Sequence, residues 1–364
     1  MKRYQWLILM MVLSSCQLGR MVYYNFADIR DYRIFPKREL KAEGSVFHFC
    51  NAKDSTCLAK TIMYNGKKEE LDKFLRKSTT VSFMVIKNDT IRYEKYFHGY
   101  KETSEVASFS MAKSVTSLLI GCAINDGLIK NVSQPVTDFI PELDPEFKKV
   151  TLEHLLNMTS GLKFNEGYIN PFGEVAKFYY GTHLRKYIRK LKLKHEPGKD
   201  FDYVSGNTQL LGLVLERVLK TKTITQYFQE KIWGPLGMEF EASWSVDRKK
   251  EGIEKTFCCI NARARDFAKI GRLMQNEGNW NGKQLVPTAW IKRSTTADLT
   301  NGGVWYYHYQ WWLASKTGGD YYADGLLGQY IYVDPAKKIV IVRLGRNHGG
   351  VRWNEVFREF AKEL

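Results

Sequence analysis

The sequence predicts an α/β protein of the α+β kind: one antiparallel sheet built from both chain ends, flanked by helices, with an inserted, mostly helical lobe. Two observations support this class. β-Rich runs lie at Thr79–Ile86 and Thr90–Phe97, and others recur at Gln329–Val333 and Ile339–Leu344. Between them, residues 125–250 carry helical patterns that proline and glycine interrupt. We therefore expect the terminal strands to share one sheet and the intervening helices to form the lobe.

Further elements follow from local patterns. A helix that begins near Ser110 is closed by the turn residues 125–127, and the chain ends in an amphipathic helix with one apolar face. Residues 17–68 are polar, with no clear period, and are predicted to be irregular. The other predicted helices span residues 69–77, 151–158, 207–219, 224–233 and 263–276.

The composition is that of a folded protein with a large core. Of the 364 residues, 44% are hydrophobic and 26% are charged, which excludes a disordered or collagen-like chain. After the N-terminus no apolar run approaches the ~20 residues that cross a bilayer, so a multi-span membrane protein is excluded. The net charge of +16 suits several anionic partners. No zinc-finger or RNA-binding motif accompanies this charge, so we expect no nucleic-acid partner.

The N-terminus is predicted to be an export signal. Lys2 and Arg3 precede an apolar stretch that ends at Leu13, and two serines stand directly before Cys16. This arrangement resembles a bacterial lipobox, which implies cleavage before Cys16 and lipid attachment to its sulfur. The alternative is an ordinary signal or membrane anchor with an incidental cysteine.

These features divide the chain into three segments. They are a signal peptide (1–15), an anchor and extension (16–68) and one folded domain (69–364). We expect the mature protein to be a lipoprotein of the bacterial cell envelope, held at the membrane through Cys16. Because an exported chain meets an oxidising compartment, Cys50 and Cys57 could close a short disulfide loop. Cys258 and Cys259 have no partner at metal-ligand spacing, and no metal or cofactor is expected.

The pair Ser110 and Lys113 is the first candidate for chemistry. Three-residue spacing puts both side chains on one face of the predicted helix. The helix is rich in small and apolar residues, so we expect it to be buried. A desolvated lysine has a lowered pKa and could accept the serine proton. A second Ser-x-x-Lys, at Ser160 and Lys163, contains Gly161 and is predicted to lie in a loop, where this geometry fails.

Two further segments could complete a site. Tyr203 lies in a loop before a helix and could point into a cleft, although packing is the alternative. The stretch Ala323–Gln329 leads into a strand, and a glycine there allows close approach of a backbone or a ligand. The signatures of Ser-His-Asp elbows, zinc hydrolases, Walker loops and dinucleotide folds are absent from the sequence.

The order Ser110-x-x-Lys113, Tyr203-x-Ser205 and Ala323-x-Gly325 resembles the serine β-lactamase and penicillin-binding-protein superfamily. The likeness is greatest to its class C-related branch, which holds family VIII carboxylesterases, 6-aminohexanoate-dimer hydrolases and D-aminopeptidases. It covers about residues 70–364, and the implied fold is β-lactamase/transpeptidase-like. Accessory stretches agree with it at residues 151–161, 232–238 and 328–335.

The resemblance implies a role for each residue. Ser110 would be the nucleophile that forms an acyl-enzyme, and Lys113 and Tyr203 would share proton transfer. The backbone N–H groups of Ser110 and Leu326, which follows Gly325, would form the oxyanion hole. A Lys113 cation near Tyr203 is expected to lower the pKa of the tyrosine, which would help it act as a base.

The sequence departs from the family pattern in two places. Ser205 stands where the family usually has Asn, with Asn207 two residues on, and either is a candidate substrate contact. Ala323 stands where the family usually has Lys or His, which binds a substrate carboxylate in penicillin-processing members. Its loss favours esters or amides that lack this carboxylate, although Arg343 or Arg346 could compensate.

The sequence therefore predicts an exported serine hydrolase that cleaves a small-molecule or peptide ester or amide through a Ser110 acyl-enzyme. His348 follows the last strand and could reach the cleft. The tripeptide Lys316–Gly318 lies between two strands and is predicted to be a hairpin turn. One alternative is a β-lactamase or D,D-peptidase acting on cell-wall peptides. Another is a non-catalytic envelope binding protein on the same scaffold.

Overall fold

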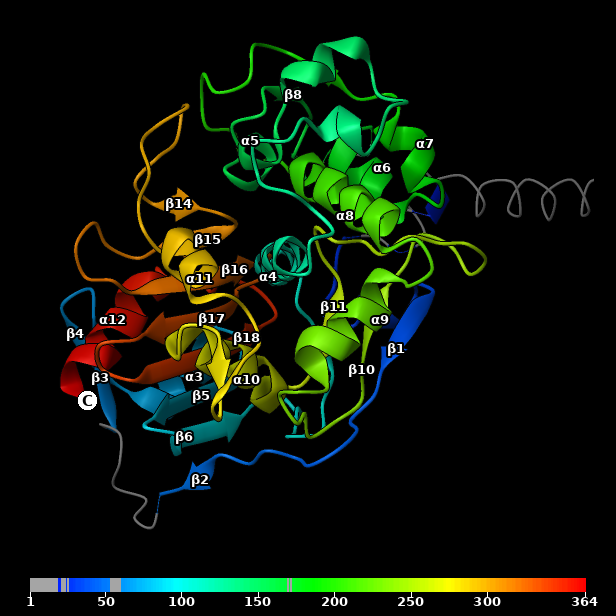
Figure 1. Cartoon of the computed structure of the whole chain (residues 1–364). Helices are drawn as coiled ribbons and strands as arrows, with labels where there is room; N and C mark the ends of the chain where they lie inside the picture. Colours follow the sequence, from blue (N-terminus) through cyan, green and yellow to red (C-terminus); the bar gives the residue numbers. More distant parts are fainter. Residues whose placement is uncertain (1–18, 21–23, 25, 53–59, 169, 171) are drawn as a thin grey trace, which may run out of the picture.

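The computed structural model describes residues 19–364 apart from 21–23, 25, 53–59, 169 and 171. Its largest sheet has eight strands: Cys50–Asn51 (β2), Thr80–Lys87 (β5), Thr90–Tyr96 (β6), Tyr307–His308 (β14), Trp311–Leu313 (β15), Tyr321–Gly325 (β16), Gln329–Asp334 (β17) and Ile339–Gly345 (β18). The strand order is β14-β15-β16-β17-β18-β5-β6-β2. β18 pairs antiparallel with β5, so strands from the two chain ends lie side by side (Figure 1). This confirms the predicted sheet.

The α-helices surround this sheet and build the inserted lobe. They span Leu71–Lys77 (α3), Met111–Asn125 (α4), Leu152–Leu156 (α5), Glu174–Tyr180 (α6), Leu184–Ile188 (α7), Ser205–Leu219 (α8), Ile224–Phe228 (α9), Ala264–Gln275 (α10), Thr288–Ser294 (α11) and Trp353–Glu363 (α12). Every predicted helix has a counterpart here, although α5 is shorter than expected. The predicted helix over 224–233 is divided between α9 and one π-helical turn, Gln229–Trp233.

The two faces of the sheet bury different side chains, because neighbours along a strand point to opposite faces. Phe83 and Val85 of β5 pack in a core with α3 and α12. Met84 and Ile86 of the same strand face the larger core, which contains α10. The sheet is thus covered on both faces, as the sequence predicts.

A second sheet contains the strand that directly precedes the predicted nucleophile, Ser110. Its strands, Lys37–Leu40 (β1), Val106–Ala107 (β7), Ala242–Ser245 (β10) and Ile260–Ala262 (β11), run in the order β1-β10-β11-β7. Short antiparallel pairs are Thr61–Tyr64 (β3) with Lys67–Glu70 (β4), Leu162–Lys163 (β8) with Lys192–Leu193 (β9), and Asn279–Trp280 (β12) with Lys283–Gln284 (β13). Figure 1 shows the lobe of α5–α8 apart from the large sheet, with α4 between the two.

The prediction that residues 17–68 are irregular holds for most of their described part but missed four short strands. β1 pairs with β10, β2 adds a parallel edge strand beside β6, and β3 and β4 form a hairpin. These strands are only two to four residues long, so they are too short to show an alternating hydrophobic pattern. β1 and β2 in addition pair with strands that are distant in sequence. Cys16 and Cys57 lie outside the described residues, so lipidation and the Cys50–Cys57 disulfide stay predictions.

The stretch Ala323–Gly325, which was predicted to be a segment before a strand, is itself part of a strand. It forms the end of β16, and Ala323 pairs with Ile331 of β17. The tripeptide Lys316–Gly318 lies in the connection between β15 and β16, as predicted. In the part of the chain described here, no helix is long and apolar enough to span a bilayer.

Candidate active site

Ser110 stands at the N-terminal end of α4, at a strained turn. The residue before it, Phe109, has a φ of +44°, which non-glycine residues seldom adopt. Ser108 fixes this turn, because its backbone N–H donates to the Ile260 carbonyl at 2.7 Å and its Oγ accepts from the Ile260 N–H at 3.1 Å. Residues 111–123 of α4 are buried, whereas Ser110 is partly exposed. The turn therefore presents the serine to the space in front of the helix.

Lys113 lies one helical turn further on and reaches Ser110. Its Nζ donates to Ser110 Oγ at 2.8 Å and to the Phe257 carbonyl at 3.0 Å. The side chain is only 1% exposed. Burial disfavours the charged ammonium and lowers the pKa of Lys113 to about 8. The charges of Glu166 and Asp324 oppose this shift without cancelling it.

Tyr203 approaches the same serine from the loop before α8. Its hydroxyl is hydrogen-bonded to Ser110, and Lys113 Nζ lies 5.0 Å from the centre of its ring. The expectation that Lys113 lowers the pKa of this tyrosine was wrong. Burial raises the pKa of Tyr203 well above 10, and the nearby carboxylates Glu166 and Asp324 raise it further. Tyr203 therefore remains a neutral phenol, and of these two groups Lys113 is the one with the lower pKa.

Two backbone N–H groups are available where an oxyanion would form. Ser110 and Leu326 line one cavity, and within the described residues neither amide has an acceptor. Gly325 makes this approach possible, because a Cβ there would lie 2.3 Å from the Ser108 carbonyl oxygen. The predicted close approach at this glycine is therefore confirmed. Paired N–H donors at such a position stabilise the charge that develops on a carbonyl oxygen.

Ser205 is held by Glu166, a residue that the sequence analysis missed. Its N–H and Oγ donate to the two carboxylate oxygens at 2.8 and 2.6 Å. The hydroxyl of Tyr168 donates to the same carboxylate at 2.9 Å. Both Ser205 and Tyr168 line the cavity beside Ser110. Glu166 lies outside helices and strands, where no period could reveal it.

Asn207 and His348 are not brought to the cavity. Asn207 is fully buried, accepts from Ser160 Oγ at 2.5 Å and donates to Met158 Sδ at 3.4 Å. It therefore has no surface to offer a substrate. His348 is exposed, and its Nδ1 lies 3.3 Å from the hydroxyl of Tyr330. Ser160 lies in a loop, as predicted, whereas exposed Lys163 ends the short strand β8, so this second pair lacks the helical geometry.

Neither Arg343 nor Arg346 replaces the cation that is missing at Ala323. Arg343 is fully buried and donates to the carbonyls of Gly328 and Ser78 at 2.5 and 2.8 Å, so its guanidinium is already bonded to the backbone. Arg346 is exposed and lies over the ring of Tyr100. Among the described residues that line the cavity, a substrate carboxylate would therefore find no arginine.

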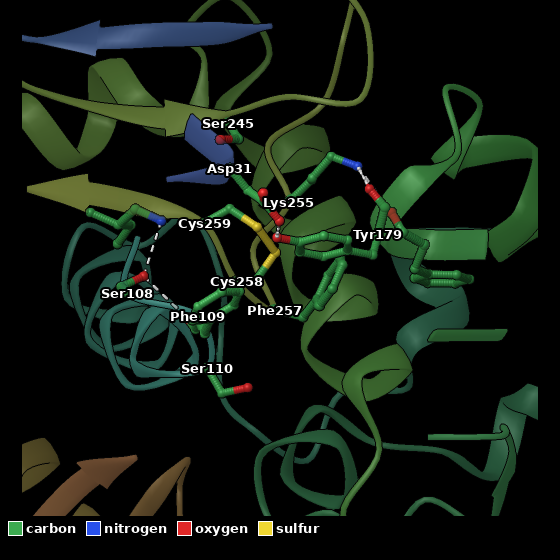
Figure 2. The surroundings of a disulfide bond; sticks show 12 residues. Asp31, Ser108, Phe109, Ser110, Tyr179, Ser245, Lys255, Phe257, Cys258 and Cys259 are labelled. Atoms are coloured by element: carbon green, nitrogen blue, oxygen red, sulfur yellow. Dashed lines mark hydrogen bonds between the residues drawn. A yellow bond between two sulfur atoms is a disulfide. The ribbon is translucent and has the colours of Figure 1, made fainter. Parts of the chain in front are cut away.

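Cys258 and Cys259 form a disulfide between adjacent residues, which the sequence analysis did not anticipate. Figure 2 shows it between Tyr179 and the turn at residues 108–110. The preceding residue, Phe257, supplies the carbonyl that accepts from Lys113. Adjacent cysteines match neither metal-ligand spacing nor the usual loop-closing disulfide, so their sequence pattern gave no signal.

Comparison with known proteins agrees with this geometry. A family model described as Beta-lactamase matches residues 71–352. A 6-aminohexanoate-dimer hydrolase from Paenarthrobacter ureafaciens is 25% identical over 301 residues, which cover 76% of this chain and 74% of the relative. The structure of a Bacillus anthracis protein provisionally assigned as a 6-aminohexanoate-dimer hydrolase has a TM-score of 0.82 at 24% identity, covering 94% of both chains. A family VIII carboxylesterase structure has a TM-score of 0.62 at 17% identity, covering 80% of this chain and 94% of that one.

Proposed function

Because the chain belongs to the beta-lactamase family and is a serine hydrolase, we propose that it cleaves an ester or amide bond through an acyl-enzyme on Ser110. The observation that carries this proposal is the 2.8 Å hydrogen bond between Lys113 Nζ and Ser110 Oγ, made by a buried lysine. With its pKa lowered to about 8, roughly a tenth of Lys113 is neutral at pH 7 and can accept a proton, and this fraction rises with pH.

Acylation then follows from the positions of these groups. Neutral Lys113 takes the Ser110 proton as Oγ bonds to the substrate carbonyl carbon. The carbonyl oxygen becomes an oxyanion, and the amides of Ser110 and Leu326 stabilise it. As the intermediate collapses, Tyr203 donates its phenolic proton to the departing alcohol or amine, and the Lys113 ammonium returns a proton to the phenolate. The result is an acyl-Ser110 ester, a free leaving group and neutral Lys113.

Deacylation repeats these steps with water in place of the leaving group. Water loses a proton to the Lys113–Tyr203 pair as its oxygen attacks the acyl carbon. Ser110 Oγ regains a proton as the acid product leaves. At the end of the cycle Ser110, Lys113 and Tyr203 have the protonation states with which they began. The released acid then ionises in solvent.

The substrate that we propose lacks a carboxylate beside the scissile bond. Ala323 replaces the usual cation, and Arg343 is buried against backbone carbonyls. A β-lactam or a D,D-peptide would therefore lose its usual charge partner. We expect nitrocefin to be turned over far more slowly than a short ester.

The test is hydrolysis of p-nitrophenyl acetate, an anilide of acetic acid and nitrocefin by the purified protein. Ester or anilide turnover that disappears in Ser110→Ala would support the proposal. Turnover retained in Ser110→Ala would contradict it, and nitrocefin as the best substrate would favour the β-lactamase alternative. Lack of any turnover together with lack of acylation of Ser110 would favour a binding protein.

The same protein is proposed to be exported and anchored through a lipid on Cys16. Support comes from the lipobox-like N-terminus and from the Cys258–Cys259 disulfide, because disulfides persist in oxidising compartments. The test is expression of the full chain in a bacterium fed labelled palmitate. Label in the parent that Cys16→Ala abolishes would support the anchor, and equal label in both would contradict it.

A further inference from the structure

An apolar cavity of about 180 Å³ opens beside Ser110. Four segments that are distant in sequence build most of it. They are residues 26–27 of the N-terminal extension, α6 of the lobe, residues 257–258 and the turn at residues 326–327. Within the described residues no charged side chain lines the cavity. An unpaired charge buried there would be costly, so the cavity suits an uncharged group.

The mouth of the cavity is apolar as well. Phe26 and Tyr168 line it, yet they are 60% and 43% exposed. Large exposed hydrophobic side chains grouped at a concave site are typical of ligand-binding surfaces. Ser110 lies among the lining residues, so a group in the cavity is adjacent to the carbonyl that the serine would attack.

The Cys258–Cys259 disulfide gives the cavity a fixed wall. Cys258 lines the cavity, and the bond to its neighbour closes a small ring that the backbone cannot rearrange without breaking it. Cys259 has a φ of +75°, a conformation that a free cysteine would tend to leave. Trp244 Nε1 donates to the Cys258 carbonyl at 3.1 Å, and Ser245 N–H donates to the Cys259 carbonyl at 2.9 Å. The wall is therefore rigid and apolar, and it is anchored to β10 of the four-stranded sheet. Figure 2 shows the two cysteines together with Ser245 of that strand.

We propose that this cavity binds an apolar, uncharged substrate group attached at the scissile bond, with the disulfide as one wall. The inference rests on the proposed Ser110 hydrolase. A cavity of about 150 Å³ holds a benzene ring, so this one takes a single ring or an alkyl chain of similar volume. Each methylene removed from water favours binding by about fourfold. Substrates with such a group should therefore be preferred over acetyl or methyl esters.

The test compares two ester series on the purified protein. One is p-nitrophenyl acetate, butyrate, hexanoate and benzoate, which vary the acyl group. The other is methyl, butyl, hexyl and benzyl acetate, which vary the alcohol. We expect kcat/KM to rise at least tenfold from the smallest to the best-fitting member of one series. A flat or falling profile in both, with turnover still dependent on Ser110, would overturn the cavity proposal alone. No Ser110-dependent turnover would overturn both proposals.

Variants test the cavity and its wall separately. Ala176→Leu fills the cavity from α6 and should lower the ratio of kcat/KM between the best-fitting and the smallest ester of the preferred series at least fivefold. The neighbouring Lys177→Leu, outside this cavity, should leave the ratio unchanged. Because both rates come from one preparation, partial unfolding cancels in the ratio. An unchanged ratio in Ala176→Leu would contradict the proposal.

The disulfide is tested in the same way. Replacing both Cys258 and Cys259 with alanine should lower the same ratio at least threefold, because the wall loses its sulfur atoms and its fixed backbone. Cys122→Ala removes a buried thiol from α4 outside the cavity and should not change the ratio. A double variant with the parental ratio would remove the disulfide from the proposal.

Discussion

The Nζ of Lys113 lies 2.8 Å from Oγ of Ser110, and the same ammonium donates to the carbonyl of Phe257 at 3.0 Å. The first bond aims the lysine at the serine proton. The second ties the lysine to the segment that directly precedes the Cys258–Cys259 disulfide. The proton acceptor is thus positioned by a helix and a distant loop together, with burial lowering its pKa.

Replacing Lys113 with methionine should abolish most activity, because among the described residues Lys113 is the group of lowered pKa that contacts Ser110. General-base catalysis contributes roughly 10²- to 10⁴-fold, and we expect kcat with p-nitrophenyl acetate to fall by that factor. Lys163→Met, in the second Ser-x-x-Lys, is the matched control and should retain parental kcat. Equal losses in the two variants would show that Lys113 has no special role.

The pH dependence follows from the direction of the Lys113 shift. The base must be neutral, so activity is lost as pH falls below its pKa. Because that pKa is about 8, kcat/KM should rise with pH, level off above this value and fall about tenfold per pH unit below it. Tyr203, whose pKa is raised, adds no falling limb near neutral pH. A profile that decreases from neutral to mildly alkaline pH in a stable protein would contradict the assignment.

Glu166→Gln should shift this profile toward lower pH. The Glu166 charge raises the pKa of Lys113, so removing the charge lowers that pKa further. KM should also increase, because Ser205 loses part of its double hydrogen bond. Glu174→Gln, at the start of α6 and outside the cavity, is the control and should leave the inflection in place. A shift toward higher pH in Glu166→Gln would be the opposite of what the charges require.

Leu326 contributes its backbone amide to the proposed oxyanion hole, so two substitutions separate amide from side chain. Leu326→Pro removes the N–H and should lower kcat about 100- to 1000-fold. Leu326→Ala keeps the N–H and should lose far less. Circular dichroism and thermal melting would establish that both variants are folded. Similar losses in folded samples of both would exclude this amide from the oxyanion hole.

Much of the site could be predicted because it depends on local sequence. Ser110 and Lys113 meet through helical spacing alone, and Tyr203 lies in the loop that leads directly into α8. The close approach at Gly325 also has a local signature, since only glycine leaves room for the Ser108 carbonyl. The matched strand pairs at the two chain ends predicted the sheet for a similar reason.

The remainder depends on contacts between distant segments. Phe26 reaches the cavity from an extension without periodicity, and Glu166 reaches Ser205 from a loop. The pKa of Tyr203 is raised because the side chain is buried, and residue spacing does not reveal burial. The direction is therefore opposite to the one expected from the Lys113 charge. Asn207 was predicted to contact substrate, but on helix α8 its side chain faces the buried core.

The central claim is that Ser110 is an activated nucleophile. The most direct measurement is the intact mass of the purified protein after incubation with a fluorophosphonate, beside Ser110→Ala and Lys113→Met. We predict one adduct in the parent, none in Ser110→Ala and much slower labelling in Lys113→Met. Equal labelling of the parent and Ser110→Ala, or no labelling of either folded protein, would contradict the claim.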